Sequence, residues 1–551
     1  MYDILDHFQV EHPTLQIIIE WLLSAFRERA LLFSWIHMII SALFPIYIGA
    51  HASLSCPPSA NKPEKRENKY GLQDDDDDEI DTVLPDMPGL QPSDAIVFPI
   101  MAGLVLSGLY LLIKWLDDPK LLNRALNLYL SFVGVIGVSR LATDSLNVVT
   151  TFIFPSFWST KKEIFLVDVP SELEITSSNP RQAQSNLKLI NRNRNPFPGP
   201  FSSIGFSSSM LSKIWFFRSL LMKRWILRGY IQNTYHAAHR VRLSDLLGFI
   251  FGLLTIILYN LIDHSWWHTN LIAFGFCYGT LQLMSPTTFW TGSLVLFGLF
   301  LYDIIMVFYT PLMVTVASSL DVPIKLIIPG PGRGSMLGLG DIVLPGIVVA
   351  LALRFDLYLH YVRMQKQASP DANGSIRVLK PNYLEATGTW GERFWSSGLD
   401  SKLTNETSFY AGQFHKVYFW ISMAGYVLGL IVTLTVLNIT KHAQPALLYL
   451  VPGVLGMLWG AAWIRGDLPI MWEYTEDGVW GTNTLVDNKE KSRVQGGQDE
   501  KSMFVFGTNS HENDAKVTNF TEPCKKVGVK EKLNKHVFLF SLTACRTSLK
   551  K

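Results

Sequence analysis

The sequence predicts an all-α, polytopic membrane protein with about nine transmembrane helices. Of its 551 residues, 48% are hydrophobic and only 17% are charged, and the mean hydropathy is +0.20. Long apolar runs alternate with polar connectors, as in chains that cross a bilayer repeatedly. The net charge of +2 gives no indication of a nucleic-acid partner. The four cysteines are scattered, so we expect no disulfide framework, metal site or cofactor.

Nine apolar segments approach or exceed the roughly 20 residues that a membrane-spanning helix needs. They cover approximately residues 31–54, 94–116, 126–154, 243–262, 267–284, 289–316, 339–358, 417–437 and 445–464. The third segment contains Arg140 and Asp144, which either pair on one helical face or mark a helix end near Ser139. Residues 14–26 are too short to span and carry Glu20, so a short amphipathic helix is expected there.

The polar parts of the chain predict its division into four regions. Residues 1–30 form an N-terminal segment, 31–242 hold helices one to three with polar inserts, 243–471 form the membrane core with helices four to nine, and 472–551 form a mostly disordered tail. The acidic loop 74–81 is expected to be solvated, with cation binding as the lesser alternative. Within 213–230, KIWFFRSLLMKRWILRGY predicts an amphipathic helix at the membrane surface.

The distribution of basic residues predicts the orientation. Residues 156–242 carry 13 Lys and Arg against four acids, whereas the connector HSWWHTN carries no Lys or Arg. Because positively charged loops stay in the cytosol, the N-terminus is expected on the lumenal side and the C-terminus in the cytosol.

Two acids lie within the apolar segments of the core. Asp341 occurs in LGLGDIVLPG at the start of the seventh segment, and Asp303 lies near the middle of the sixth, FWTGSLVLFGLFLYDIIMVFYTPLMVTV. A carboxylate at membrane depth costs about 2.5–3.5 kcal/mol on insertion scales, so it is usually functional or neutralised. Consecutive helices are commonly neighbours, so Asp303 and Asp341 can face each other.

Such a pair predicts aspartic-protease chemistry. Two carboxylates at close range in a dry site share one proton, so that one activates water while the other polarises a peptide carbonyl. Gly338 and Gly340 allow close approach to the backbone, and Pro345 removes the helical donor of the Asp341 carbonyl. In KHAQPALLYLVPG, Pro445, Ala446 and Leu447 open the ninth segment as a compact surface beside the acids.

These motifs together resemble the signal peptide peptidase family of intramembrane aspartyl proteases, the GxGD group that includes presenilin. The resemblance rests on YD in an apolar helix, GLGDIVLPGIVVALALRFD, KHAQPALLYLVPG and ALFPIYIGAHASL, and spans roughly residues 31–475.

The resemblance implies that Asp303 and Asp341 are catalytic, that Tyr302, Gly338, Leu339 and Gly340 complete their motifs, and that Pro445, Ala446 and Leu447 position substrate. It also implies cleavage of transmembrane helices of signal-peptide remnants and type II membrane proteins in the endoplasmic reticulum.

Two other functions stay open. A proteolytically silent scaffold could bind membrane segments through the same surface, and a transporter could use the acids for protons or cations, although no internal repeat of the transporter kind is evident. The expected partners are transmembrane helical peptides and the lipid bilayer, with a second copy of the chain or quality-control proteins of the endoplasmic reticulum as further options.

Overall fold

The computed structural model describes two compact units, which are considered separately. The described residues are 13–61, 89–90, 92–116, 120–155, 157–159, 164–168, 173–177, 195–231, 235–261, 265–310, 312, 315–316, 322–329, 335–367, 378–381, 383, 388–392, 394–395, 414–440, 444–476 and 538–544. The larger, helical unit comprises Met1–Arg66, Met87–Met222 and Arg242–Glu476, and the smaller comprises Glu67–Asp86, Lys223–Val241 and Asp477–Lys551. The acidic loop 74–81 lies outside the described residues.

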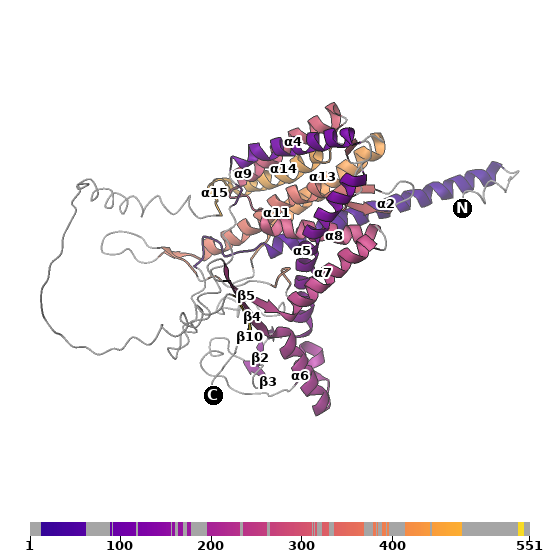
Figure 1. Cartoon of the computed structure of the whole chain (residues 1–551). Coiled ribbons are helices and arrows are strands. Elements are labelled where there is room, and N and C mark those ends of the chain that lie inside the picture. Colours follow the sequence, from indigo (N-terminus) through magenta and orange to yellow (C-terminus); the bar gives the residue numbers. More distant parts are fainter. Residues whose placement is uncertain are drawn as a thin grey trace, which may run out of the picture. The chain divides into compact units, whose positions relative to one another are not determined.

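Nine long helices in the described part of the chain follow the nine predicted segments (Figure 1). They are α2 (Pro13–Ala52), α4 (Asp94–Trp115), α5 (Lys120–Ile153), α7 (Leu243–Leu261), α8 (Trp266–Leu283), α9 (Phe289–Ile304), α11 (Leu339–Met364), α13 (Val417–Thr440) and α14 (Leu447–Arg465). Within the described ranges, eight of these helices are long and apolar enough to cross a membrane, and α8 is the one that is not. The predicted fold class, a polytopic helical membrane protein, is confirmed.

Helix α8 is not among the helices that qualify as membrane spans, and it carries polar side chains with structural partners. Asn270 donates its amide to the Ile327 carbonyl and accepts the Ile327 N–H, both at 2.8 Å. Tyr278 donates its hydroxyl to Asp144 at 2.6 Å. Buried polar groups in a membrane protein need such partners, since lipid offers none.

Helix α11 is the central helix of the larger unit. It contacts α2, α8, α9, α13 and α14, and every residue from Pro345 to Leu357 is buried. A helix that is apolar all round belongs inside a bundle, where neighbours cover each face. The helix that carries Asp341 is therefore held on several sides by other helices.

Helices α13 and α14 pack closely through glycines. A Cβ atom added to Gly453 would lie 2.6 Å from the Gly425 carbonyl oxygen. Small residues let transmembrane helices approach backbone to backbone, which is a main source of packing energy where water supplies none. This close contact fixes how α14 presents its N-terminus to the rest of the unit.

Helix α5 continues through the charged part of the third segment. It extends past Ser139 to Ile153, so the alternative in which the helix ends there is wrong. Asp144 accepts a hydrogen bond from Tyr278 of α8, and it also interacts electrostatically with Arg140. The pair predicted from the sequence thus extends to a third residue on a neighbouring helix.

The sixth and seventh segments are separated by structure that the sequence analysis did not predict. A π-helical turn at Ile305–Tyr309 (η2) follows α9, so the regular helix ends before the predicted residue 316. Two antiparallel strands, β6 (Lys325–Ile328) and β7 (Ser335–Gly338), then lead directly into α11. The all-α prediction holds for the membrane bundle but missed this hairpin, whose strands have four residues each.

The predicted surface helix at 213–230 is only half correct. Helix α6 (Ser208–Met222) includes the first part of this stretch and ends at Met222, and β4 (Arg224–Ile231) takes up the remainder. In the smaller unit, β4 lies between β10 (Phe538–Ala544) and β5 (Tyr235–Arg242). The aromatic and β-branched residues of RWILRGYI suit a strand, and pairing on both sides outweighs the helical preference read from the sequence.

The described part of the predicted tail ends the larger unit and supplies one strand of the smaller. Short helix α15 (Leu468–Glu473) follows α14, and β10 is the other described element beyond residue 472. A further sheet with strand order β1-β2-β3 is formed by Phe157–Ser159, Ile164–Asp168 and Leu173–Ser177. The four predicted domain boundaries stay predictions.

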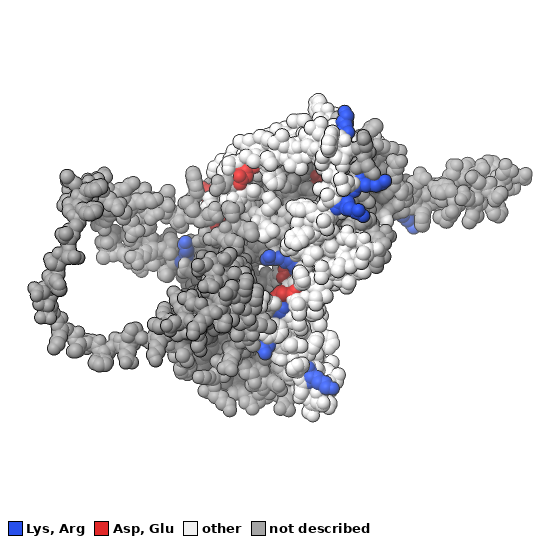
Figure 2. Space-filling model, viewed as in Figure 1, with Lys and Arg blue, Asp and Glu red and all other residues white. Residues whose placement is uncertain are grey.

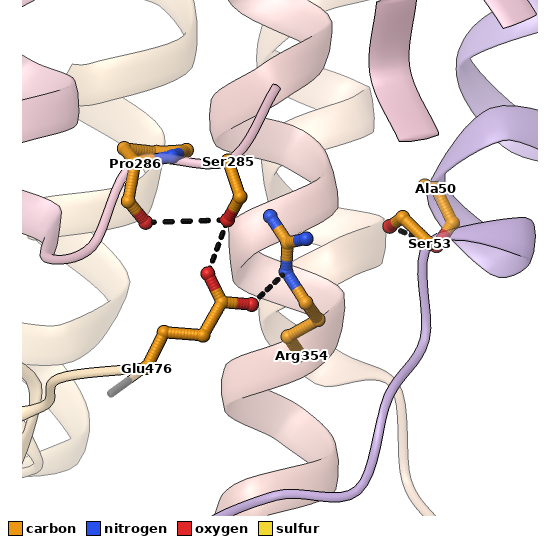
Figure 3. A network of polar contacts seen from close by, with 6 residues as sticks. All are labelled: Ala50, Ser53, Ser285, Pro286, Arg354 and Glu476. Carbon is orange, nitrogen blue, oxygen red and sulfur yellow. Dashed lines mark hydrogen bonds and ion pairs between the residues drawn. The ribbon is translucent and has the colours of Figure 1, made fainter. Parts of the chain in front are cut away.

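A buried ion pair ties α11 to the chain after α15 (Figure 3). The Arg354 guanidinium lies 2.9 Å from Glu476, and only 7% of the arginine side chain is exposed. Ser285, which follows α8, donates its hydroxyl to the same carboxylate. The Glu476 backbone N–H also donates to the Thr287 carbonyl at 2.9 Å. This network joins three separate parts of the chain beside α11.

The outer surface of the helical unit is apolar. The side chains of Leu104, Phe132 and Ile464 are 62%, 71% and 81% exposed. In Figure 2 much of the helical surface facing the viewer is white, without Lys, Arg, Asp or Glu. Exposed apolar surface of this extent marks contact with a partner or a membrane, and together with the spans it describes a multi-pass membrane protein.

Candidate active site

Asp303 and Asp341 come together at the ends of two packed helices. Asp303 lies in the last turn of α9 and is 4% exposed. Asp341 lies in the first turn of α11. The two helices contact each other, and the two carboxyl groups are near enough to interact electrostatically. The structure thus brings together the two acids that the sequence singled out, 38 positions apart.

The N-terminus of α14 binds Asp303. The Leu447 backbone N–H donates to Asp303 Oδ2 at 3.1 Å. Leu447 is the first residue of α14, and Ala446 is its N-cap. The first N–H groups of a helix have no partner within the helix, and this end carries a partial positive charge. The ninth-segment motif therefore positions Asp303 through its backbone.

Tyr426 of α13 holds the backbone of Asp341. Its hydroxyl donates to the Asp341 carbonyl at 3.4 Å, and its side chain is fully buried. Pro345 lies inside α11, four residues after Asp341, and has no N–H to give that carbonyl. The helix continues through Pro345, so the predicted weakening is met by a side-chain donor from another helix.

The two glycines of the motif leave space beside Asp341. Gly338 and Gly340 are both exposed. A Cβ added to Gly340 would come no closer than 4.0 Å to the nearest neighbouring atom, which belongs to Leu344. A Cβ on Gly338 would lie 3.4 Å from Asp341 Oδ2. The junction between β7 and α11, where these glycines lie, is therefore open to an incoming chain, in agreement with the close approach expected from the sequence.

The other predicted residues lie around this site. Leu339 donates its N–H to the Ile324 carbonyl at 3.2 Å, which joins the start of α11 to the hairpin. Tyr302 is half-buried and lies against Gly103 of α4, and it also interacts electrostatically with Asp303. Pro445 and Ala446 are buried where they precede α14.

The outer edge of β7 is the free edge of the hairpin among the described residues. Ile327 of β6 is bonded through both its N–H and its carbonyl to the side chain of Asn270, so that edge of β6 is occupied. The other edge of β6 pairs with β7. Met336 of β7 is 63% exposed. An extended chain could add to β7 next to Asp341.

The arrangement suits acid–base chemistry by two carboxyl groups. Among the described residues, no group of three or more His, Cys, Asp or Glu side chains could hold a metal ion. Sequence reasoning found the acids and the ninth-segment motif but missed Tyr426. The sequence gives little indication of this role for Tyr426, because Asp341 is 85 residues away and α13 carries other aromatic residues.

Comparison with known proteins identifies the family. Residues 81–478 match the family model described as signal peptide peptidase. This match covers the site and all helices from α4 to α14.

Relatives from several organisms agree with this match. The signal peptide peptidase of Homo sapiens is 26% identical over 463 residues, which cover 82% of this chain and 86% of the human protein. A probable intramembrane protease of Schizosaccharomyces pombe is 33% identical over 44% of this chain and 66% of its own. A probable intramembrane protease of Saccharomyces cerevisiae is 22% identical over 89% of this chain and 80% of its own length. The chain is a multi-pass membrane protein of the protease type and belongs to the signal peptide peptidase family.

Proposed function

We propose that the protein is an aspartyl endopeptidase that cleaves peptide bonds within transmembrane helices, with Asp303 and Asp341 as its catalytic pair. The observation that carries the proposal is the meeting of these two carboxyl groups at the contact of α9 and α11. Membership of a family of intramembrane proteases supports it. Its substrates are the helices of signal-peptide remnants and type II membrane proteins.

The surroundings of the two acids suggest different roles. The Leu447 N–H at 3.1 Å favours the negatively charged form of Asp303, as does the N-terminus of α14. Asp303 is therefore assigned as the base and Asp341 as the acid that holds the shared proton. In the first step Asp303 takes a proton from water, the water oxygen adds to the carbonyl carbon, and the proton of Asp341 passes to the carbonyl oxygen.

The second step breaks the peptide bond. The tetrahedral carbon expels the amine, which takes the proton that Asp303 received from water. The hydroxyl that formed from the carbonyl oxygen returns its proton to Asp341, so the products are a carboxylic acid and an amine. The pair is then ready for another water molecule, and no covalent enzyme intermediate forms.

The substrate helix must unwind before this chemistry, because helical hydrogen bonds shield its peptide bonds. Unpaired backbone groups are costly in lipid, so the unwound stretch needs new partners. The free edge of β7 can supply them. The exposed Gly338 and Gly340 leave room for that stretch beside Asp341.

The basic connectors support an orientation with a lumenal N-terminus, and the family resemblance supports the endoplasmic reticulum as the location. In this orientation the C-terminal ends of α11 and α14, which lie away from Asp303 and Asp341, face the cytosol. A glycosylation acceptor sequence fused to either end of the chain tests the orientation, because only a lumenal acceptor is modified.

The deciding experiment is cleavage of a signal-peptide substrate by the purified protein in detergent. Asp303→Asn and Asp341→Asn should each abolish cleavage, whereas Asp94→Asn, at the start of α4 and away from the two acids, should not. Cleavage by all three variants would point to a contaminant. No cleavage by the unaltered protein, under conditions where a relative is active, would favour the silent scaffold.

A second experiment tests the unwinding step. Two substrates differ only in their membrane segment, which is rich in Leu in one and contains helix-destabilising Gly and Ser in the other. We expect the second to be cleaved faster. Equal rates would contradict the need for local unwinding but would leave the catalytic pair untouched.

A further inference from the structure

A polar cavity lies at the other ends of the helices that build the active site. Its volume is about 230 Å³, and its lining includes Asp356, Arg363, His415 and Arg465. Arg363 is in the last turn of α11, His415 lies just before α13, and Arg465 is the last residue of α14. The cavity thus combines the C-terminal ends of two helices with the N-terminal end of a third.

The two arginines of this cavity are matched in charge by Asp356 in its lining and Asp467 beside it, so what they offer a ligand is N–H donors. Asp356 accepts the N–H groups of Tyr418 at 3.2 Å and Phe419 at 2.9 Å, so its carboxylate serves the N-terminus of α13. Arg465 lies 3.6 Å from Asp467 through one nitrogen. A guanidinium has five N–H donors, so Arg465 keeps others for a ligand.

The position of the arginines suits an anion with apolar parts. Arg465 stacks 5.8 Å from the ring of Tyr418, which fixes its direction. Trp463 and Ile464, which precede Arg465 in the chain, are 75% and 81% exposed. Met364, which follows Arg363, is 41% exposed. Arginines at a helix end, beside exposed apolar side chains, resemble the boundary between headgroups and acyl chains.

We propose that this cavity binds the phosphate group of an anionic phospholipid, with the acyl chains along the apolar surface beside Trp463 and Ile464. Arginine is well suited to phosphate because its planar group can donate two parallel hydrogen bonds. The volume equals that of about eight water molecules at roughly 30 Å³ each, enough for a phosphate and part of its headgroup.

The same three helices carry Asp341 and the two groups that hold the catalytic pair in place. Asp341 and Arg363 are both on α11, and 22 residues of helix place them about 33 Å apart. Helix α13 carries Tyr426, and α14 begins with the Leu447 N–H that binds Asp303. A phosphate held between Arg363 and Arg465 therefore joins the far ends of α11 and α14.

The test measures lipid binding by the purified full chain in detergent, using native mass spectrometry. The probes are a short-chain phosphatidylinositol 4-phosphate, the same headgroup without acyl chains, and a short-chain phosphatidylcholine. The unaltered protein should bind the anionic lipid at least about tenfold more tightly than phosphatidylcholine. The variant Arg363→Gln/Arg465→Gln should lose about tenfold or more of that affinity.

Three controls make the result decisive. Lys213→Gln removes an exposed basic residue of α6, outside the cavity, and should leave binding unchanged. Arg363→Gln alone changes only an exposed side chain, so we expect it to fold and to weaken binding, which keeps the test decisive where the double variant fails to fold. Arg363→Lys should keep more affinity than Arg363→Gln, because the charge remains.

Each other outcome overturns the proposal. Equal affinity for phosphatidylcholine would show that charge does not select the ligand. Equal affinity for the headgroup alone would mean that the cavity takes a soluble phosphate rather than a lipid. Tight anionic lipid binding that Arg363→Gln and the folded double variant leave unchanged would place the lipid elsewhere. Because the readout is binding, it does not depend on whether the protein cleaves peptides.

Discussion

The hydroxyl of Tyr426 donates to the backbone carbonyl of Asp341 at 3.4 Å. This is the carbonyl that Pro345, four residues further along α11, leaves without a helical donor. A tyrosine on α13 thereby completes the hydrogen bonding of the helix turn that carries one catalytic candidate. The relationship also links the position of Asp341 to the packing of α13 against α11.

Replacing Tyr426 by Phe tests this link. The hydrogen bond is long, so its loss should cost at most about 1 kcal/mol of stability, whereas the altered position of Asp341 should lower the cleavage rate severalfold. Cleavage kinetics and thermal unfolding in detergent measure the two effects. Tyr129→Phe, on an exposed face of α5, is the matched control. An unchanged cleavage rate would show that the carbonyl needs no such donor.

Lengthening Asp303 tests the role of the α14 N-terminus. Asp303→Glu keeps the charge but displaces the carboxylate by one methylene from the Leu447 N–H, which now lies at 3.1 Å. Because a displacement of about 1 Å can cost 10²-fold in rate, cleavage should fall by about that factor or more. The thermal midpoint should change little. Retention of full activity would mean that the placement of this carboxylate is not critical.

The close contact of α13 and α14 predicts different results for two glycines on one helix. Gly453→Ala places a Cβ 2.6 Å from the Gly425 carbonyl oxygen, so the helices must separate, and stability should fall by about 1–3 kcal/mol. Gly456→Ala meets no atom within 4 Å and should be neutral or slightly stabilising. Thermal unfolding of both variants decides, and equal effects would contradict the close contact.

The buried Arg354–Glu476 pair predicts a coupled effect on stability. Glu476→Gln leaves the Arg354 charge buried and without its partner carboxylate, which should cost about 3–5 kcal/mol. Arg354→Met in the same chain should recover part of this loss, since no buried charge then remains. A double-mutant cycle by thermal unfolding measures the coupling. If the two losses simply add, the pair contributes little to holding residue 476 in place.

Hydropathy predicted the bundle well because each span is defined by a local run of apolar residues. The two acids could be found in the same way, since a carboxylate such as Asp303 in a run without basic residues is conspicuous. The β6–β7 hairpin was missed because strands of four residues, KLII and SMLG, are too short to show an alternating pattern.

The supports of the site could not be predicted because they depend on tertiary contacts. The Leu447 N–H and Asp303 are 144 residues apart in sequence, and a backbone donor has no signature of its own. Strand β4 was interpreted as a helix because its pairing with β10, more than 300 residues away, is absent from any local pattern.

Helix α2 is 40 residues long and continuous from Pro13 to Ala52. The part that qualifies as a membrane span begins at Leu31 and has 22 residues, about 33 Å of helix, which matches the thickness of the hydrocarbon layer. The preceding 18 residues add about 27 Å of helix. This extension belongs to the same helix as the span, so the short separate helix expected at residues 14–26 does not form, and a tilt of the span would be carried along the helix as far as Pro13.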